Sequence, residues 1–231
     1  MKRNYFDFII CGGGASGILL LKALQEDAYF SKYSILLIEK EVKNSNDRTW
    51  CFWEASSSDF EPLLSKTWDH AQFCSKGIHL EFTLAPFQYK MLRSAGVYQT
   101  FYKQAQQAKN ITFLQAEVQD VQTLDDFTEI VTSEGKFQSK RVFNSLFNPK
   151  LLWNQKKYPV LQQHFVGWFI KTSQPVFDPD KILFMDFDIP QEKETRFLYV
   201  LPQDPYTALV EYTLFSEQLL EFKDYEKGIR S

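Results

Sequence analysis

Cysteine is scarce in this chain of 231 residues, with only Cys11, Cys51 and Cys74 present. An odd number of cysteines without a CxxC pair indicates neither a disulfide framework nor a thiolate metal site. The sequence is therefore typical of a reducing compartment, and we interpret the three thiols as inert buried groups. The three histidines lack the spacing of metal ligands, so we expect no bound metal.

Blocks of like charge and long apolar runs are also absent. Lys and Arg number 26 and Asp and Glu 29, a net charge of −3, which argues against nucleic acid as a partner. No apolar stretch approaches the roughly 18–20 residues of a membrane-spanning helix. Lys2 and Arg3 precede an apolar run, as in a signal peptide, but Asp7 and several glycines interrupt that run, so we predict a strand there.

Aromatic residues, in contrast, are abundant: they make up 16% of the chain and include 22 phenylalanines. The apolar fraction of 44% and the charged fraction of 24% are typical of a globular protein. At roughly 100–200 residues per domain, the length allows one large domain or one domain and part of another. The aromatic excess suits a large core or an apolar ligand, and it does not decide between them.

The first forty residues have the pattern of a βαβ unit. Residues 5–11 and 34–39 are short apolar runs of the kind that forms buried parallel strands. Residues 15–26 predict the helix between them. Glu39 stands at the end of the second strand, 22 residues after Gly17.

A GxGxxG motif occupies the turn between the first strand and the helix, in the segment Gly12-Gly13-Gly14-Ala15-Ser16-Gly17. In this context Gly12 allows a tight turn, Gly14 lets the backbone approach a pyrophosphate at the helix N-terminus, and Gly17 allows close packing of helix on strand. Glu39 is placed to accept from ribose hydroxyls, and its charge disfavours the 2′-phosphate of NADP. The motif predicts a dinucleotide containing ADP, although a structural glycine turn is the alternative.

The order of the following elements favours FAD over NAD. We predict a long functional loop over residues 41–66, short strands over 71–74 and 78–83, an amphipathic helix over 89–108 and a β-meander over 111–145. This order resembles the flavoprotein hydroxylase and reductase superfamily, in which a meander interrupts the nucleotide domain. A pure nicotinamide enzyme normally continues with further βα repeats.

A change in pattern near Asn148-Pro149 predicts a domain boundary, followed by a polar stretch to Pro159. Four alternating segments then predict antiparallel strands over 165–172, 182–187, 196–201 and 208–215, with a helix over 216–227. The predicted fold class is therefore α/β, with a Rossmann-type FAD-binding domain of the glutathione-reductase/hydroxylase kind over 1–150. An antiparallel-sheet substrate domain, expected to be incomplete, covers 151–231.

Several separated segments resemble the lycopene cyclase family of FAD-dependent carotenoid enzymes. They are DFIICGGGASG at 7–17, SILLIEK at 34–40, RTWCFW at 48–53, YKMLRSAGVY at 89–98, QQHFVGWFIKT at 162–172 and FLYVLPQDPYTALVEYT at 197–213. The tryptophan loop and the last segment are the discriminating ones. Family members continue into a second flavin-binding segment, so the resemblance implies that a C-terminal part is lacking after Ser231.

The resemblance implies roles for particular residues. Glu211 takes the place of the acidic residue that acts as catalytic acid and base. The residues expected at the cofactor are Gly12, Gly13, Gly14, Ala15, Ser16, Gly17, Glu39, Lys40, Arg48, Thr49, Arg93 and Val118. Those expected at the substrate are Trp50, Phe52, Trp53 and Tyr212. The residue pattern alone leaves alternatives open. Glu211 also fits a solvated strand residue, and the residues of the tryptophan loop also fit a hydrophobic core. Arg48 and Arg93 also fit surface arginines.

The implied reaction is the redox-neutral cyclisation of the linear end groups of lycopene to β-ionone rings. A carboxylic acid protonates an alkene, a ring closes and a proton is lost, while reduced FAD and indole rings stabilise the cation. NAD(P)H is the expected electron donor. Because the substrate is lipophilic, we expect a cytoplasmic protein peripherally associated with the inner membrane. The alternatives are a flavin-dependent hydroxylase or polyprenyl reductase of the same superfamily and a non-catalytic nucleotide-binding fragment.

Overall fold

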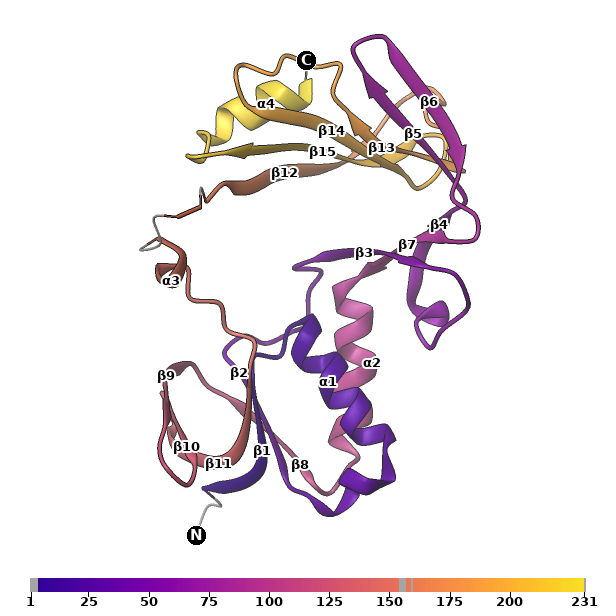
Figure 1. Ribbon diagram of the computed structural model, residues 1–231. Coiled ribbons are helices and arrows are strands. Elements are labelled where there is room, and N and C mark those ends of the chain that lie inside the picture. Colours follow the sequence, from indigo (N-terminus) through magenta and orange to yellow (C-terminus); the bar gives the residue numbers. More distant parts are fainter. Residues whose placement is uncertain (1–3, 154–156, 159, 231) are drawn as a thin grey trace. The chain divides into compact units, whose positions relative to one another are not determined.

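The computed structural model describes residues 4–153, 157–158 and 160–230. Lys2, Arg3 and part of the predicted polar boundary (154–156 and 159) lie outside the described residues. The chain divides into two compact units, each built from two separate stretches: 1–49 with 93–148, and 50–92 with 149–231. Figure 1 shows the chain leaving and re-entering each unit.

The first unit contains the predicted βαβ unit. A six-stranded sheet has the order β8-β2-β1-β11-β10-β9, in which β8, β2, β1 and β11 run parallel. Its elements are β1 (Tyr5–Cys11), α1 (Ala15–Glu26), η1 (Ala28–Lys32), β2 (Ile35–Glu39), α2 (Ser94–Gln106), β8 (Ile111–Gln115), β9 (Val118–Thr123), β10 (Thr128–Thr132) and β11 (Gly135–Asn144). The strands β1 and β2 are central in this sheet, and their apolar runs are buried as the pattern predicts.

Two apolar clusters hold this sheet, one on each face. Phe8, Ile10 and Leu37 pack with α1 and α2 on one face. On the other face Ile9 and Leu36 pack with residues of the meander. Because side chains alternate along β1 and β2, these two strands contribute residues to both apolar clusters. The turn that follows β1 is held between the two clusters.

The meander differs from its prediction in one respect. The sequence pattern predicts two strands over 136–139 and 142–145, but residues 136–144 lie in the single strand β11, which ends before Ser145. The polar Ser139 lies in the middle of it, and its Oγ lies within hydrogen-bond distance of two carbonyl oxygens that can accept its proton, those of Asp7 (3.0 Å) and Arg141 (2.9 Å). A buried polar residue is accommodated here because its hydroxyl group has partners within the sheet.

The second unit contains two sheets. The larger has the order β12-β15-β14-β13-β5-β6, and the smaller has the order β3-β7-β4. Its elements are β3 (Thr49–Glu54), η2 (Glu61–Leu63), β4 (Leu64–Trp68), β5 (His70–Ser75), β6 (Ile78–Thr83), β7 (Gln88–Arg93), α3 (Lys150–Trp153), β12 (Gln162–Lys171), β13 (Lys181–Asp186), β14 (Thr195–Pro202), β15 (Thr207–Ser216) and α4 (Phe222–Arg230). The larger sheet is antiparallel as expected except where β13 pairs in parallel with β5.

The two faces of the larger sheet are covered differently. Helix α4 covers one face, where Tyr212, Leu214 and Tyr225 form the core. The smaller sheet covers part of the other face, where Leu201 and Leu209 pack against Trp68 and Met91 of its strands. None of the described helices has the length and apolar character needed to cross a membrane.

Three predicted elements are corrected. The loop predicted over 41–66 contains β3 and β4, and the helix predicted over 89–108 begins only at Ser94, because residues 88–93 form β7 between β3 and β4. Tyr89 and Met91 are both buried on one side of β7, which is the period of a strand. Pairing within the small sheet thus overrides the helical spacing. The last helix begins at Phe222 rather than Ser216, since Ser216 still belongs to β15.

The division into units also differs from the predicted domains. The change of unit between Asn148 and Pro149 lies close to the predicted division at residue 150. The stretch 50–92, however, was assigned to the first domain and belongs to the second unit. It does so because β5 pairs with β13 and completes the larger sheet.

Candidate functional site

The glycine turn in the first unit is built by close backbone contacts. Gly12 has a φ of +102°, which favours glycine, and its amide donates to Ile38 O (2.9 Å). A Cβ at Gly17 would lie 1.9 Å from Gly12 O, so helix α1 can start at this distance from β1 only with glycine there. Gly14 caps the helix, and a Cβ at Gly14 would meet nothing within 4 Å.

This geometry leaves a helix N-terminus facing open space. The first main-chain hydrogen bond of α1 runs from Ile18 N to Gly14 O (3.0 Å), so the amides of Ala15 and Ser16 precede the helical ladder. Amides in this position bind phosphate groups. Gly14 therefore offers the open backbone surface that a pyrophosphate needs.

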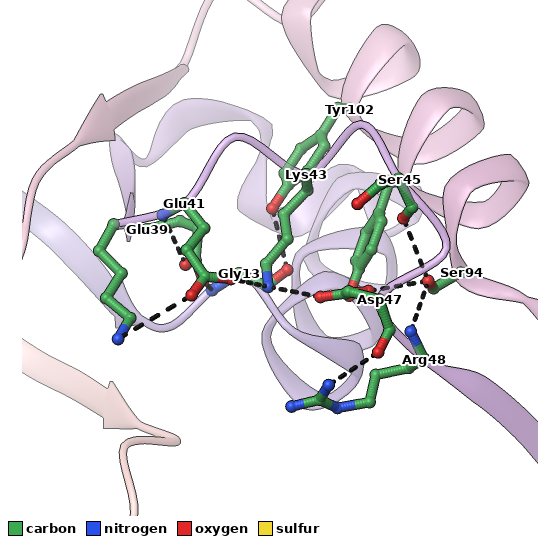
Figure 2. A network of polar contacts seen from close by, with 11 residues as sticks. Gly13, Glu39, Glu41, Lys43, Ser45, Asp47, Arg48, Ser94 and Tyr102 are labelled. Carbon is green, nitrogen blue, oxygen red and sulfur yellow. Dashed lines mark hydrogen bonds and ion pairs between the residues drawn. The ribbon is translucent and has the colours of Figure 1, made fainter. Parts of the chain in front are cut away.

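Glu39 connects the end of β2 to the glycine turn. Its Oε2 accepts from Gly13 N (2.6 Å) and its Oε1 from Glu41 N (3.0 Å). Tyr102, on α2, donates to Gly13 O (2.9 Å) from the other side (Figure 2). Each carboxylate oxygen retains further acceptor capacity, so Glu39 can also accept from hydroxyl groups of a ribose.

The segment after β2 is attached to α2 by a second polar cluster (Figure 2). Asp47 Oδ1 accepts from Ser94 Oγ (2.8 Å), and its Oδ2 accepts from Lys43 Nζ (3.0 Å). Burial alone would raise the pKa of Asp47, but the hydrogen bonds from Lys43 and Ser94 lower it below its usual value. Ser94 Oγ also accepts from Arg48 N (3.1 Å), which fixes the backbone that carries the Arg48 side chain.

A cavity of about 470 Å³ lies beside the glycine turn. It is lined by Gly12, Gly14, Ile38, Glu39, Lys40, Glu41, Lys43, Arg48, Ala116, Glu117, Val118, Ser145 and Leu146. This volume lies within the usual range for small-molecule sites. The open Gly14, the ribose acceptor at Glu39 and the cations of Lys40, Lys43 and Arg48 fit an ADP-containing dinucleotide.

The cavity brings together most of the predicted cofactor residues. Gly12, Gly14, Glu39, Lys40, Arg48 and Val118 line it, and Ala15, Ser16 and Gly17 form the first turn of the adjoining helix. Gly13 is covered by Glu39 and Tyr102 instead. Thr49 and Arg93 begin β3 and end β7 and are not among the lining residues.

Glu211 is in the middle of β15 in the second unit. It is paired with Tyr199 of β14 on one side and with Gly167 of β12 on the other. The side chain is half-buried, and burial raises the pKa of its carboxyl group. Among the residues that the structure describes, no hydrogen bond or ion pair to this carboxyl group is found. A carboxyl group desolvated without a partner is typical of a catalytic acid.

An aromatic cluster borders Glu211 on the side of the smaller sheet. Tyr199 Oη donates to Tyr89 Oη, and Tyr89 hydrogen-bonds to the thiol of Cys51. Trp53 packs on Tyr89 with ring centroids 4.8 Å apart, and Phe184 packs on Tyr199 at 5.8 Å. The cluster presents electron-rich ring faces and little charge.

Burial and the neighbouring acidic groups keep this cluster neutral. Burial raises the pKa of Cys51 to about 12, and the charge of Glu211 adds to that shift. Burial likewise raises the pKa of Tyr89 and of Tyr199, with Cys51 and Glu211 as further causes. Glu211 is therefore surrounded by groups that carry no charge at neutral pH.

The predicted substrate residues are separated by strand alternation. Trp53 lies on the side of β3 that packs on Tyr89, but Phe52 packs on Phe60 (6.2 Å), and Trp50 lies on the side of Phe52. Tyr212 lies on the opposite face of the sheet from Glu211, on the side of α4. There it accepts from Arg196 (3.2 Å) and packs beneath Gly228 of α4.

Sequence reasoning missed Cys51, Tyr89, Phe184 and Tyr199. The alternation in residues 197–201 could have placed Tyr199 beside Glu211, since the two strands were predicted as neighbours in sequence. Tyr89 was assigned to a helix, so its contact with Tyr199 could not be anticipated. Within the described part of the chain, no three His, Cys, Asp or Glu side chains gather as a metal site would require.

The two units together define the class of protein. A Rossmann-type unit with a glycine turn and a meander, joined to a mostly antiparallel sheet, is the fold of FAD-binding flavoproteins. The family model described as lycopene cyclase protein matches residues 7–231. The chain belongs to the lycopene cyclase family. Among curated individual proteins, none matches the sequence.

Solved structures with the same fold are distant in sequence. A geranylgeranyl bacteriochlorophyll reductase-like protein of Thermoplasma acidophilum is 12% identical, with a TM-score of 0.69 over 99% of this chain and 61% of that one. The halogenase PltM, solved with phloroglucinol and FAD, is 10% identical, with a TM-score of 0.65 over 97% and 55%. The p-nitrophenol 4-monooxygenase PnpA of Pseudomonas putida is 12% identical, with a TM-score of 0.62 over 98% and 62%. The chain spans 55–62% of the length of these three proteins.

Proposed function

We propose that this protein takes part in the redox-neutral cyclisation of the linear end groups of lycopene, with Glu211 as the acid and base. The observation that carries the proposal is the carboxyl group of Glu211, which is half-buried, makes no hydrogen bond or ion pair to the described residues, and is bordered by aromatic side chains. Membership of the lycopene cyclase family supports the substrate class. FAD is the proposed cofactor, bound at the cavity beside the glycine turn.

Glu211 has the properties that the proton transfers need. Its raised pKa keeps the carboxyl group protonated at higher pH than an exposed glutamate, so it can donate a proton to the terminal C=C bond of the substrate. The electron pair of a second C=C bond then closes a six-membered ring and leaves a tertiary carbocation. The resulting carboxylate removes a proton and a ring double bond forms, so the proton gained equals the proton lost.

The neighbouring side chains stabilise the positive charge without reacting. The π-faces of Trp53, Tyr89 and Tyr199 are electron-rich and attract a cation. Tyr89 is buried, and a dry surrounding of this kind limits the addition of water to the carbocation. Reduced FAD, when bound, supplies further electron density for the same purpose.

The cofactor would be held by the first unit. The first-turn amides of α1 and Arg48 would bind the pyrophosphate, and Glu39 would accept from ribose hydroxyls. NAD(P)H is the proposed electron donor for the flavin. A cytoplasmic location at the surface of the inner membrane is proposed because the substrate dissolves in lipid; flotation of the purified chain with lipid vesicles tests that part.

The decisive experiment is expression of this chain in cells that accumulate lycopene, followed by pigment analysis. We expect ringed carotenes from the wild type and a loss of about 100-fold or more in Glu211→Gln, the order of magnitude that a general acid contributes. Both proteins should retain the same flavin absorbance. The matched control is Glu217→Gln, a solvent-exposed glutamate just after β15.

Two other outcomes would replace the proposal. Consumption of NAD(P)H in proportion to product would indicate a reductase or hydroxylase, a reading favoured by the fold shared with the reductase-like protein. Flavin binding without conversion of any polyene would indicate a nucleotide-binding fragment. Full activity of Glu211→Gln would remove this residue from the mechanism.

A further inference from the structure

The edge strand β12 carries an unusual gap beside Glu211. Gly167 is paired directly with Glu211, and a Cβ at Gly167 would lie 2.8 Å from Glu211 Cγ and 3.1 Å from its Oε1. The first distance is shorter than real Cβ contacts, and the second is tighter than nine in ten of them. The carboxyl group therefore lies over the bare backbone of Gly167, in space that every other residue type would fill.

The residues two positions before and after this gap are exposed phenylalanines. Phe165 is 56% exposed and Phe169 is 51% exposed, although both rings are large and apolar. Alternation along β12 puts both on the face that carries Gly167 and Glu211. Helix α4 packs on the opposite face, so it does not cover them.

The strip is bounded by polar residues. On the same face of β12, Gln163 precedes Phe165 and Lys171 follows Phe169. Phe165 and Phe169 lie about 13 Å apart along the strand, at 3.3–3.4 Å per residue. The residues of β15 paired with this part of β12 on the same face are Leu209, Glu211 and Thr213, of which Thr213 is buried. A largely apolar ligand with one point of proton transfer matches this surface.

We infer that Gly167 is a positioning residue for Glu211, and that Phe165 and Phe169 hold an apolar, unsaturated hydrocarbon end group against its carboxyl group. This inference rests on the proposed function and names the part of the sheet where the substrate binds. The glycine gives the carboxyl group its place over the strand, between the positions of the two phenylalanines along β12. The rings contribute apolar contact area, with no charge to be desolvated.

The experiment compares single and double variants of the full chain. In Gly167→Ala the new methyl group displaces the Glu211 side chain, and we expect kcat to fall by about 100-fold, the scale reported for a misplacement of about 1 Å. The melting temperature should not decrease, because alanine is tolerated in a strand at least as well as glycine. Gly96→Ala is the matched control, since a Cβ at Gly96 on α2 meets nothing within 4 Å.

Rescue separates positioning from a general structural effect. Glu211→Asp shortens the acid by one methylene and makes room for the alanine methyl group. We expect Gly167→Ala/Glu211→Asp to be no less active than Glu211→Asp alone, and more active than Gly167→Ala. A double variant that is no better than Gly167→Ala, or a Gly167→Ala protein with wild-type kcat, would overturn the positioning role.

The two rings are tested by binding, which needs no turnover. Quenching of tryptophan fluorescence by lycopene in detergent micelles measures the affinity of the chain for a polyene. We expect Phe165→Ala/Phe169→Ala to bind about 10-fold more weakly, as for truncation of an aromatic contact, and Phe82→Ala, an exposed phenylalanine on the other edge strand, to bind as the wild type does. Equal weakening in both variants, or none in the double variant, would refute the binding strip.

These measurements distinguish the two levels of proposal. A wild-type chain that makes no ringed product contradicts the proposed function, while lycopene binding still decides whether the strip exists. A wild-type chain that cyclises lycopene, together with a fully active Gly167→Ala, contradicts only the inference about Gly167.

Discussion

The hydroxyl group of Tyr199 donates a hydrogen bond to the hydroxyl group of Tyr89, which precedes it by 110 residues. Tyr89 in turn donates a hydrogen bond to the sulfur of Cys51, so the two donors point in the same direction. The hydroxyl proton of Tyr199 is therefore used in the hydrogen bond to Tyr89. The hydroxyl oxygen of Tyr199 can act toward other neighbours only as an acceptor.

The first prediction follows from the direction of the hydrogen bond that Tyr199 donates to Tyr89. In Tyr89→Phe the proton of Tyr199 loses its acceptor and is free to turn toward Glu211, where it would stabilise the carboxylate. We expect the fall of cyclisation rate at high pH to move to lower pH. In Tyr89→Phe/Tyr199→Phe this donor is removed and the displacement should be smaller. Tyr206→Phe, which changes an exposed tyrosine outside the cluster, should leave the pH profile as in the wild type.

The second prediction concerns the effect of pH on stability. Because burial raises the pKa of Glu211, the folded chain holds this proton more tightly than the unfolded chain does. The free energy of unfolding should therefore decrease as the pH rises from about 4.3, the usual value for glutamate, through the raised pKa. Glu211→Gln removes the carboxyl group whose ionisation lowers the free energy of unfolding. The variant should therefore be more stable than the wild type at pH 7 and equally stable near pH 3.5. Urea denaturation of both proteins at the two pH values measures their free energies of unfolding. If variant and wild type differ by the same free energy at both pH values, the carboxyl group of Glu211 is not desolvated.

The third prediction separates two glycines of the same motif. Gly17→Ala would place a methyl group 1.9 Å from the carbonyl oxygen of Gly12, so we expect a loss of roughly 3 kcal/mol or more of stability, as for severe overpacking. Gly14→Ala meets nothing within 4 Å and should fold normally. Its methyl group would nevertheless stand where the pyrophosphate approaches, so we expect FAD affinity to fall by about 10-fold or more, which corresponds to one lost contact of about 1.4 kcal/mol. Thermal melts and flavin fluorescence titrations test both variants, and normal FAD affinity in Gly14→Ala would contradict the assigned site.

The fourth prediction concerns Ser94, which is fully buried between Asp47 and Arg48. Ser94→Ala leaves Asp47 Oδ1 and Arg48 N without this partner, which should cost about 1–3 kcal/mol. The segment that carries Arg48 should loosen, and FAD affinity should decrease. Thr100→Ala, on the exposed side of the same helix, removes a hydroxyl group bonded only to Gly96 O and serves as the control. Equal effects of the two variants would mean that the polar cluster does not support the cofactor site.

The fifth prediction concerns Lys90, whose side chain is buried beside two glutamates. Its Nζ donates to Glu54 Oε2 (2.9 Å), to Ser56 O (3.2 Å) and to Glu61. Glu54→Ala/Glu61→Ala would leave the cation unpaired and should cost about 3–5 kcal/mol. Lys181→Met breaks an exposed pair with Glu81 and should cost less than about 1 kcal/mol. Since Lys90 lowers the pKa of Glu54, the stability due to this pair should be lost as the pH falls through that lowered pKa.

The βαβ unit could be predicted from sequence because local and long-range signals agree there. The apolar runs of β1 and β2, the glycines between them and Glu39 all indicate the same arrangement. Much of the cofactor cavity follows from that unit, since eight of its lining residues come from the turn, the end of β2 and the segment after it. The remaining lining residues, at 116–118 and 145–146, are brought to the cavity by the sheet.

The surroundings of Glu211 could not be predicted in the same way. Tyr89 and Met91 fit a helical spacing with residues further along the chain, and only their pairing within the small sheet makes them a strand. The position of Tyr89 beside Tyr199 depends on two sheets packing face to face. Tyr212, expected at the substrate from the family resemblance, follows Glu211 in the strand, and adjacent residues of a strand point to opposite faces. A contact that is set by packing between sheets leaves no local trace in the sequence.

The parallel pairing of β5 with β13 has a consequence for synthesis of the protein. About 100 residues separate the end of β6 from the start of β13, so at roughly 5–20 residues per second a ribosome needs about 5–20 s to make the partner strand. During that interval the β5–β6 hairpin has emerged with one edge unpaired and with Ile78, Leu80 and Phe82 exposed to the solvent. Such an edge attracts other nascent chains. The yield of folded protein should therefore depend on chaperones that bind extended apolar segments, and slower, cooler growth should increase it.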